Sequence, residues 1–262
     1  MIGKNISKQI SFLLVENPKI TGVYWIKNES RFIEQSLKSV MDICTEIIIL
    51  DDNSSDDTVE ICSSIDKVKE IIKQKELPLN ETRDRNYLFE KARKGNPDFI
   101  LAVDGDEIFM PNASETLFEE LSTIHPNSDV FEFQFLTLWD NVNTIRTDGI
   151  FGYYWQKRLL RMKNQPLSLL FVENDNPGNI HCGSIPPSSV GFHYPAKSSV
   201  KIFHLASLDD EVRQRKYGFY TKTDPDNVLT GAYKHMISGE GKFSGPNGIE
   251  LEQLPKEFTV NL

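Results

Sequence analysis

Short apolar runs alternate with amphipathic stretches through the first hundred residues. The apolar runs predict buried strands, at 20–26, 46–50, 68–73 and 98–103. Between them, apolar residues recur at helical spacing. The clearest such stretch predicts a helix from Glu81 to Arg93 that turns Tyr87, Leu88 and Ala92 inward and that Gly95 ends. Strand–helix alternation with short turns is typical of a mostly parallel sheet covered by helices. The predicted fold class is therefore α/β.

The pattern changes beyond residue 110. Residues 129–139 alternate and are rich in aromatic side chains, which predicts a long antiparallel strand. Further strands are expected at 155–162 and 200–205, and a helix at 209–221. The stretch 163–195 is rich in Pro, Asn and Gly, so it predicts loops around a site. The second half should therefore extend the sheet with antiparallel strands.

Carboxylates crowd the end of the fourth predicted strand. Asp104, Gly105, Asp106 and Glu107 follow the apolar run 99–103 directly. Ligands of open α/β sheets bind at this edge. Oxygen ligands suit Mg²⁺ or Mn²⁺, which is usually shared with a phosphate. Asp104 and Asp106, two residues apart, should face one ligand, and Gly105 lets the backbone approach it. The alternative is a solvated turn, and Glu107 should point away.

Two other polar loops follow strand ends and should lie at the same edge. Asp51 and Asp52 end the second strand, where a carboxylate can accept hydrogen bonds from a nucleobase N–H or from ribose. Asp56 and Asp57 belong either to this site or to a helix N-terminus. A calcium loop is excluded, because its glycine and glutamate positions hold Asp56 and Cys62. In the loop 27–29, Asn28 is predicted as a helix N-cap.

Basic and histidine residues supply further candidates. Arg85 could neutralise phosphate charge or form a surface salt bridge. His204 ends an apolar strand and is predicted as a metal ligand. His181 lies among loop residues and is either a catalytic group on the acceptor side or a loop anchor. The basic, tyrosine-containing cluster at 213–220 is either a solvated face or a site for phosphates or acceptor.

Composition and charge argue against several classes of protein. The net charge of -9 argues against nonspecific nucleic-acid binding. Cys44, Cys62 and Cys182 form neither a disulfide framework nor a zinc pattern, which indicates a reducing compartment. No apolar run approaches the roughly 18 residues of a membrane span. The apolar stretch 10–15 is too short for a signal peptide. A cytoplasmic protein is expected.

Together, the motifs resemble those of the family 2 glycosyltransferases, which have the GT-A fold, over roughly residues 20–225. Ile26-Lys27-Asn28-Glu29 resembles the first-strand signature, and residues 50–58 resemble the nucleotide loop Asp-Asp-X-Ser-X-Asp-X-Thr. Arg85-Asn86 is similar to the Arg-Asn pair before the fourth strand. Residues 103–107 are similar to the Asp-X-Asp motif. These four segments occur in the family's order and on one predicted sheet edge.

The resemblance implies roles for individual residues. Asp104, Asp106 and His204 would hold Mn²⁺ or Mg²⁺, with Asp106 acting on the diphosphate. The family's catalytic-base pair is not matched here, so the base is left open between Glu173, Asp175 and His181. The residues implied to bind the nucleotide are Lys27, Asn28, Glu29, Asp51, Asp52, Arg85, Asp104 and Gly105.

The resemblance also implies an activity: metal-dependent, inverting transfer of a sugar from a nucleotide-sugar donor, with a UDP-sugar favoured. The acceptor would be a hydroxyl of a bacterial glycan or lipid-linked precursor, which leaves peripheral membrane association open. A degenerate transferase or glycan-binding module without turnover is the alternative. A sugar nucleotidyltransferase is disfavoured, because the loop 27–29 lacks glycine. One domain is expected over 1–225, with a nucleotide-binding half (20–110) and an acceptor-side half (111–225), followed by a flap or tail (226–262).

Overall fold

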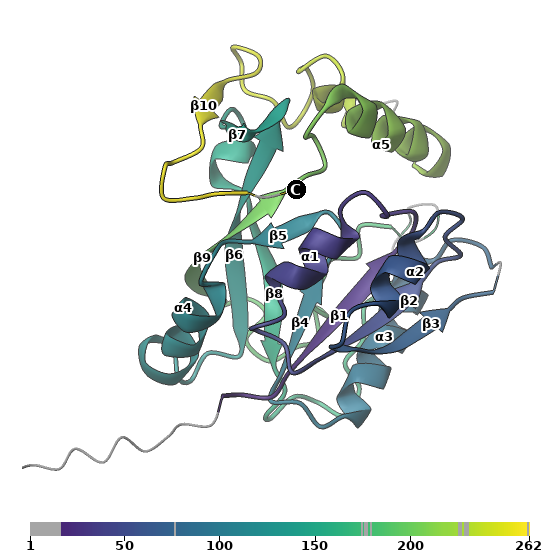
Figure 1. Cartoon of the computed structure of the whole chain (residues 1–262), viewed down its shortest axis with the longest axis vertical. Helices are drawn as coiled ribbons and strands as arrows, with labels where there is room; N and C mark the ends of the chain where they lie inside the picture. Colours follow the sequence, from purple (N-terminus) through teal and green to yellow (C-terminus); the bar gives the residue numbers. More distant parts are fainter. Residues whose placement is uncertain are drawn as a thin grey trace, which may run out of the picture.

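The computed structural model describes residues 17–75, 77–173, 175, 178, 180–224, 227, 231–260 and 262. Within them, a curled sheet is flanked by helices (Figure 1). Its strands are β1 (Ile20–Ile26), β2 (Glu46–Asp51), β3 (Val68–Lys73), β4 (Phe99–Val103), β5 (Glu107–Phe109), β6 (Val130–Trp139), β7 (Asn141–Arg146), β8 (Trp155–Arg161), β9 (Ala196–His204) and β10 (Leu251–Gln253). The helices are α1 (Ile33–Ser39), α2 (Thr58–Ser63), α3 (Glu81–Lys94), α4 (Ala113–Glu119) and α5 (Asp210–Thr223), with short helical turns at Glu120–Ile124, Phe151–Tyr153 and Lys234–Met236.

The sheet has a parallel half and an antiparallel half. Strands β3, β2, β1 and β4 lie side by side in that order, all parallel. On the far side of β4 come β8, β6, β7 and β10, each antiparallel to its neighbour. Strand β9 is parallel to β6 and antiparallel to β5. The α/β class and the antiparallel extension are confirmed.

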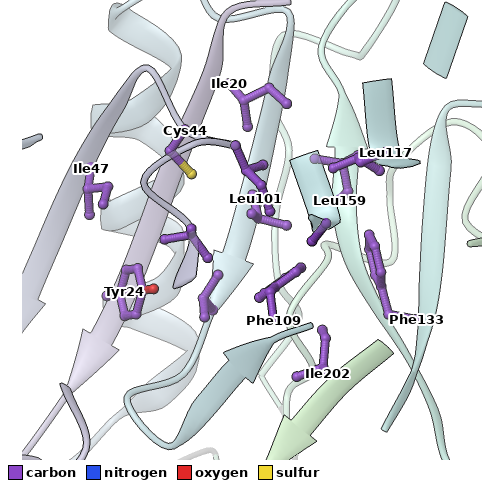
Figure 2. Close-up of a cluster of buried hydrophobic side chains, with 14 of the residues drawn as sticks. Ile20, Tyr24, Cys44, Ile47, Leu101, Phe109, Leu117, Phe133, Leu159 and Ile202 are labelled. Atoms are coloured by element: carbon purple, nitrogen blue, oxygen red, sulfur yellow. The ribbon is translucent and has the colours of Figure 1, made fainter. Parts of the chain in front are cut away.

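Helices cover both faces of the parallel half because its strands are apolar on both sides. Successive side chains of a strand point to opposite faces. Tyr24 therefore belongs to the core under α1 and α4, while Val23 belongs to the core under α3. Figure 2 shows the first of these cores, where Phe109 and Phe133 extend it toward the antiparallel half. The parallel half of the sheet is thus packed between helices on both faces, which fixes the positions of its strand ends.

Two local predictions are wrong. Asn28 is not a helix N-cap: its φ is +54°, and its side-chain oxygen accepts a hydrogen bond from the Ser55 backbone nitrogen at 2.8 Å. Asparagine tolerates this left-handed conformation, so it makes a turn there instead. Tyr87 does not point inward from α3 but is 46% exposed, because Leu88 and Phe89 fill the buried face.

The chain after α5 packs onto the antiparallel half. Strand β10 pairs with β7, and the buried Arg146 and Asp148 hold the loop that precedes β10. Arg146 donates to the His235 carbonyl and to Ser244 Oγ, and its guanidinium stacks on Phe151. The described part of 226–262 is therefore fastened to the sheet, while the proposed boundary at 225 stays a prediction.

No helix in the described part of the chain is both long and apolar enough to cross a membrane. The apolar stretch 10–15 lies outside the described residues.

Candidate active site

The carboxyl edge of the parallel strands opens into a cavity of about 840 Å³. Helix α5 and the segment carrying β7 and β10 lie at this end of the molecule (Figure 1). Polar side chains from the ends of β1, β2 and β4 and from α3 line it, together with many aromatic side chains. The polar residues include Lys27, Asn28, Glu29, Asp52, Arg85, Asp104 and Asp106, and the aromatic ones include Phe135, Phe151, Tyr154, Tyr220 and Tyr233. The three predicted polar loops do meet at one edge.

Only one of the two aspartates ending β2 faces this cavity. The buried Asp52 lines it and accepts a hydrogen bond from Lys27 Nζ at 3.0 Å. Asp51 points the other way, toward a separate hollow of about 520 Å³, and accepts from the Ser54 backbone nitrogen at 3.1 Å. The division follows from strand geometry, in which neighbours face opposite sides. Asp51 shapes the turn, and Asp52 is available to a ligand.

The first loop packs against the carboxylate motif. The carboxyl of Glu29 is largely buried, and its Oε2 atom has no hydrogen-bond partner. Burial and the nearby charge of Asp106 raise the pKa of Glu29 to about 7. Gly105 makes room for this side chain, because a Cβ there would lie 2.7 Å from Glu29 Cγ.

Asp104 is held by two arginines. Arg85 approaches its Oδ1 at 3.1 Å and Arg158 its Oδ2 at 2.9 Å. Burial alone would raise the pKa of Asp104, but Arg158 and Arg85 hold it well below its usual range. Arg158 also pairs with the buried Glu107. Arg158 lies on β8 and was missed from the sequence; its signal was an arginine inside the apolar strand pattern 155–162.

Asp106 has different partners. Its Oδ2 accepts from Lys216 Nζ of α5 at 2.5 Å and lies 3.7 Å from His204 Nε2. Burial lowers the pKa of His204 to about 4, so this imidazole is neutral at pH 7 with a lone pair for a ligand. Asp104 and Asp106 both line the cavity, but the chain turns at Gly105 instead of continuing extended, so the two carboxylates have different partners.

The predicted metal set is only partly assembled. Among the described residues, no three His, Cys, Asp or Glu side chains lie close enough together to hold a metal ion. Both carboxylate oxygens of Asp104 are paired with Arg85 and Arg158. Asp106 and His204 therefore remain as the candidate metal ligands. This pair still fits a cation that takes its remaining oxygens from a diphosphate, as Mg²⁺ usually does. In this structure, Lys216 donates a hydrogen bond to the Asp106 carboxylate.

The three candidate bases are placed differently. Glu173 and Asp175 are exposed, and neither is among the described residues lining the cavity. His181 does line it, and its Nε2 lies 2.6 Å from the Tyr233 hydroxyl. No local pattern pointed to Tyr233, because the last forty residues lack periodicity. In the basic cluster, Arg215, Lys216 and Tyr220 line the cavity, whereas Arg213 binds Asp140.

Several known proteins are similar to parts of this chain. The chain matches the family model described as Glycosyl transferase family 2 over residues 25–174. The uncharacterized protein MT1568 of Mycobacterium tuberculosis is 32% identical over 93 residues, which are 34% of this chain and 28% of that protein.

Two solved structures are also similar in part. S. aureus TarS has a TM-score of 0.45 and 17% identity, covering 83% of this chain and 43% of that one. Glucosyl-3-phosphoglycerate synthase from Mycobacterium tuberculosis, solved with Mn²⁺ and UDP-glucose, has a TM-score of 0.33 and 18% identity, covering 46% and 44%. The chain thus spans less than half the length of these relatives.

The family match extends from the end of β1 through the carboxylate motif to the loop after β8. It includes the sheet edge at which Asp52, Asp104 and Asp106 meet, and the sheet has the GT-A arrangement. Since the match covers more than half of the chain, the chain belongs to glycosyl transferase family 2.

Proposed function

We propose that this glycosyltransferase moves a sugar from a nucleotide sugar, with a UDP-sugar favoured, to a hydroxyl group of a bacterial glycan or its lipid-linked precursor. The observation that carries the proposal is the convergence of Asp52, Asp104 and Asp106 on one cavity at the carboxyl edge. The activity of the whole protein rests on the same proposal.

The nucleoside would bind at Asp52. A buried carboxylate accepts hydrogen bonds, so it suits a base that carries a ring N–H. Uracil has such a group between two carbonyls, and Lys27, 3.0 Å from Asp52, could donate to one of them. Guanine shares the ring N–H, whereas adenine and cytosine lack it. This favours a uracil nucleotide over an adenine or cytosine one.

The diphosphate would lie between Asp106 and α5. The charge of Arg85 is already balanced by Glu81 and Asp104, which lie 2.6 Å and 3.1 Å away. Helix α5 adds two more cations that line the cavity, Arg215 and Lys216, and Lys216 already pairs with Asp106. Asp106 and His204 would hold Mn²⁺ or Mg²⁺, which would neutralise charge on the departing diphosphate. Inversion then requires the acceptor hydroxyl to attack from the opposite side.

The test is binding of UDP to the Asp106→Ala variant by calorimetry with and without Mn²⁺. We expect the variant to lose the Mn²⁺-dependent part of the affinity, because a metal ligand is gone. Asp57→Ala is the matched control, since Asp57 is exposed and makes no side-chain cap. Unchanged Mn²⁺-dependent binding in Asp106→Ala would contradict the metal assignment.

The donor is identified by incubating the protein with a panel of nucleotide sugars and Mn²⁺ and measuring released nucleotide. Release from UDP-sugars supports transfer chemistry. Binding without release from any of them would instead favour a glycan-binding or degenerate protein.

A further inference from the structure

Three side chains form a hydrogen-bonded network beside the cavity, and two of them, His181 and Tyr233, line it. His181 Nε2 lies 2.6 Å from the Tyr233 hydroxyl, which lies 2.5 Å from Asp224 Oδ2. Asp224 is fully buried at the end of α5, whereas 44% of the His181 side chain is exposed. A buried carboxylate is thus connected through a phenol to an imidazole that reaches the cavity.

The direction of these hydrogen bonds follows from the protonation of the two ends. Burial alone would raise the pKa of Asp224, but hydrogen bonds from Tyr233 and Asn227 lower it, so this carboxylate is ionised and can only accept. Burial and the Asp224 charge raise the pKa of Tyr233 well above its usual value, so Tyr233 keeps its single proton and donates it to Asp224. The phenol oxygen must then accept from His181 Nε2–H.

The lone pair of His181 is consequently on Nδ1. A neutral imidazole carries one proton, and this network assigns it to Nε2. No hydrogen bond to Nδ1 exists among the described residues, and His181 lines the cavity. His181, which lines the cavity, therefore carries its unshared lone pair on Nδ1.

The backbone at His181 is held in an unusual conformation. Its φ is +65°, in the left-handed region that costs energy for a residue with a side chain. Its backbone nitrogen donates to Glu81 Oε2 at 2.7 Å, and Glu81 in turn binds Arg85, the partner of Asp104. Tyr220 stacks on Tyr233 with ring centroids 4.3 Å apart. The imidazole is thus fixed relative to the carboxylate motif from two sides.

We propose that His181 is the general base of the transfer and that Tyr233 and Asp224 are positioning residues that set its tautomer. This role rests on the proposed function. The acceptor oxygen forms a bond to the anomeric carbon, the bond from that carbon to the diphosphate oxygen breaks, and its electron pair leaves with the diphosphate. The acceptor's proton goes to Nδ1, and Asp224 stabilises the resulting imidazolium through Tyr233.

The Asp224→Asn variant tests the direction of the hydrogen bonds that connect Asp224, Tyr233 and His181. An asparagine amide can donate to the phenol oxygen, which frees Tyr233 to donate to Nε2. The imidazole proton then moves to Nδ1, and the lone pair on Nδ1 is lost. Tyr233→Phe removes the hydroxyl group that connects His181 to Asp224 but keeps the aromatic ring that stacks on Tyr220. Tyr217→Phe is the control, because Tyr217 lies on α5 but is absent from the described lining of the cavity.

The experiment uses the full chain with Mn²⁺ and the UDP-sugar that it hydrolyses fastest, with water as the acceptor. We expect His181→Ala to lower kcat by about 10²- to 10⁴-fold, with partial rescue by added imidazole. Asp224→Asn should lower kcat by up to about 10⁴-fold. In each case the donor KM and the UDP affinity should stay unchanged. Nitrogen-15 NMR should show the His181 proton on Nε2 in the native protein and on Nδ1 in Asp224→Asn.

Two results would overturn the assignment while leaving the donor proposal intact: native kcat in His181→Ala, or a proton on Nδ1 of the native protein. Failure of the native protein to bind UDP at all would instead overturn the proposed function, and the role of His181 with it.

Discussion

At the scale of single residues, Gly105 shows how closely the carboxylate motif packs. The site needs Glu29 beside Asp104 and Asp106, and only a residue without a side chain leaves space for it. The atoms that a methyl group would meet include Glu29 Cβ at 2.9 Å, which cannot swing away as the end of a long side chain could. The tight turn and the buried Glu29 therefore depend on each other.

We expect Gly105→Ala to lower the free energy of unfolding by about 1–3 kcal/mol, the usual cost of overpacking. Gly218→Ala is the control: nothing lies within 4 Å of its Cβ position inside α5, so alanine should stabilise the helix by up to about 1 kcal/mol. Urea unfolding of both variants measures the difference. Equal effects of the two substitutions would contradict the packing argument.

At the scale of elements, α5 places Lys216 on Asp106, although few of its residues are buried. Its N-terminus is fixed by Asp209, whose side chain accepts from the Val212 backbone nitrogen at 2.9 Å and also pairs with Arg31. The ion pair is partly exposed, and such pairs contribute little. The cap should therefore matter more than the ion pair.

We expect Asp209→Ala to destabilise the protein by about 0.5–2 kcal/mol, because the cap is lost. Asp209→Asn should keep most of this stability, since asparagine caps equally well without the charge. Hydrogen exchange of α5 amides distinguishes the two. If Asp209→Asn loosened α5 as much as Asp209→Ala does, the ion pair and not the cap would hold the helix.

At the scale of the whole molecule, residues far apart in the chain close the cavity. The segment after α5 contributes Tyr233, and its position depends on the buried Arg146–Asp148 pair beneath it. Arg146 is fully buried between Trp139 and Phe151. Removing one partner of such a pair leaves an uncompensated charge inside the protein.

Arg146→Met should accordingly lower the free energy of unfolding by about 3–5 kcal/mol and release the segment 231–260 to proteases. Lys38→Met is the control, because Lys38 and Glu34 form an exposed pair on α1 that should contribute about 0.5 kcal/mol or less. Denaturation and limited proteolysis report the two effects. Native protease resistance in Arg146→Met would show that the segment is held by other contacts.

The sequence by itself determined the order of strands and helices in the parallel half and the carboxylates that end its strands. Both depend on local periodicity: β1 and β3 have the predicted bounds, and Asp52, Asp104 and Asp106 stand where their strands end. Because strands alternate with helices, the strands run parallel and their carboxyl ends lie at one edge of the sheet, whatever other contacts the chain makes.

Only the tertiary structure decided which of these residues act together. Asp104 meets Arg158 across 54 positions, Asp106 meets Lys216 across 110, and His181 meets Tyr233 across 52. These pairings depend on how β8, α5 and the C-terminal segment pack, and no local pattern encodes that packing. The sequence could therefore place the carboxylates at one edge, but the fold selected their partners and brought His181 to the same cavity.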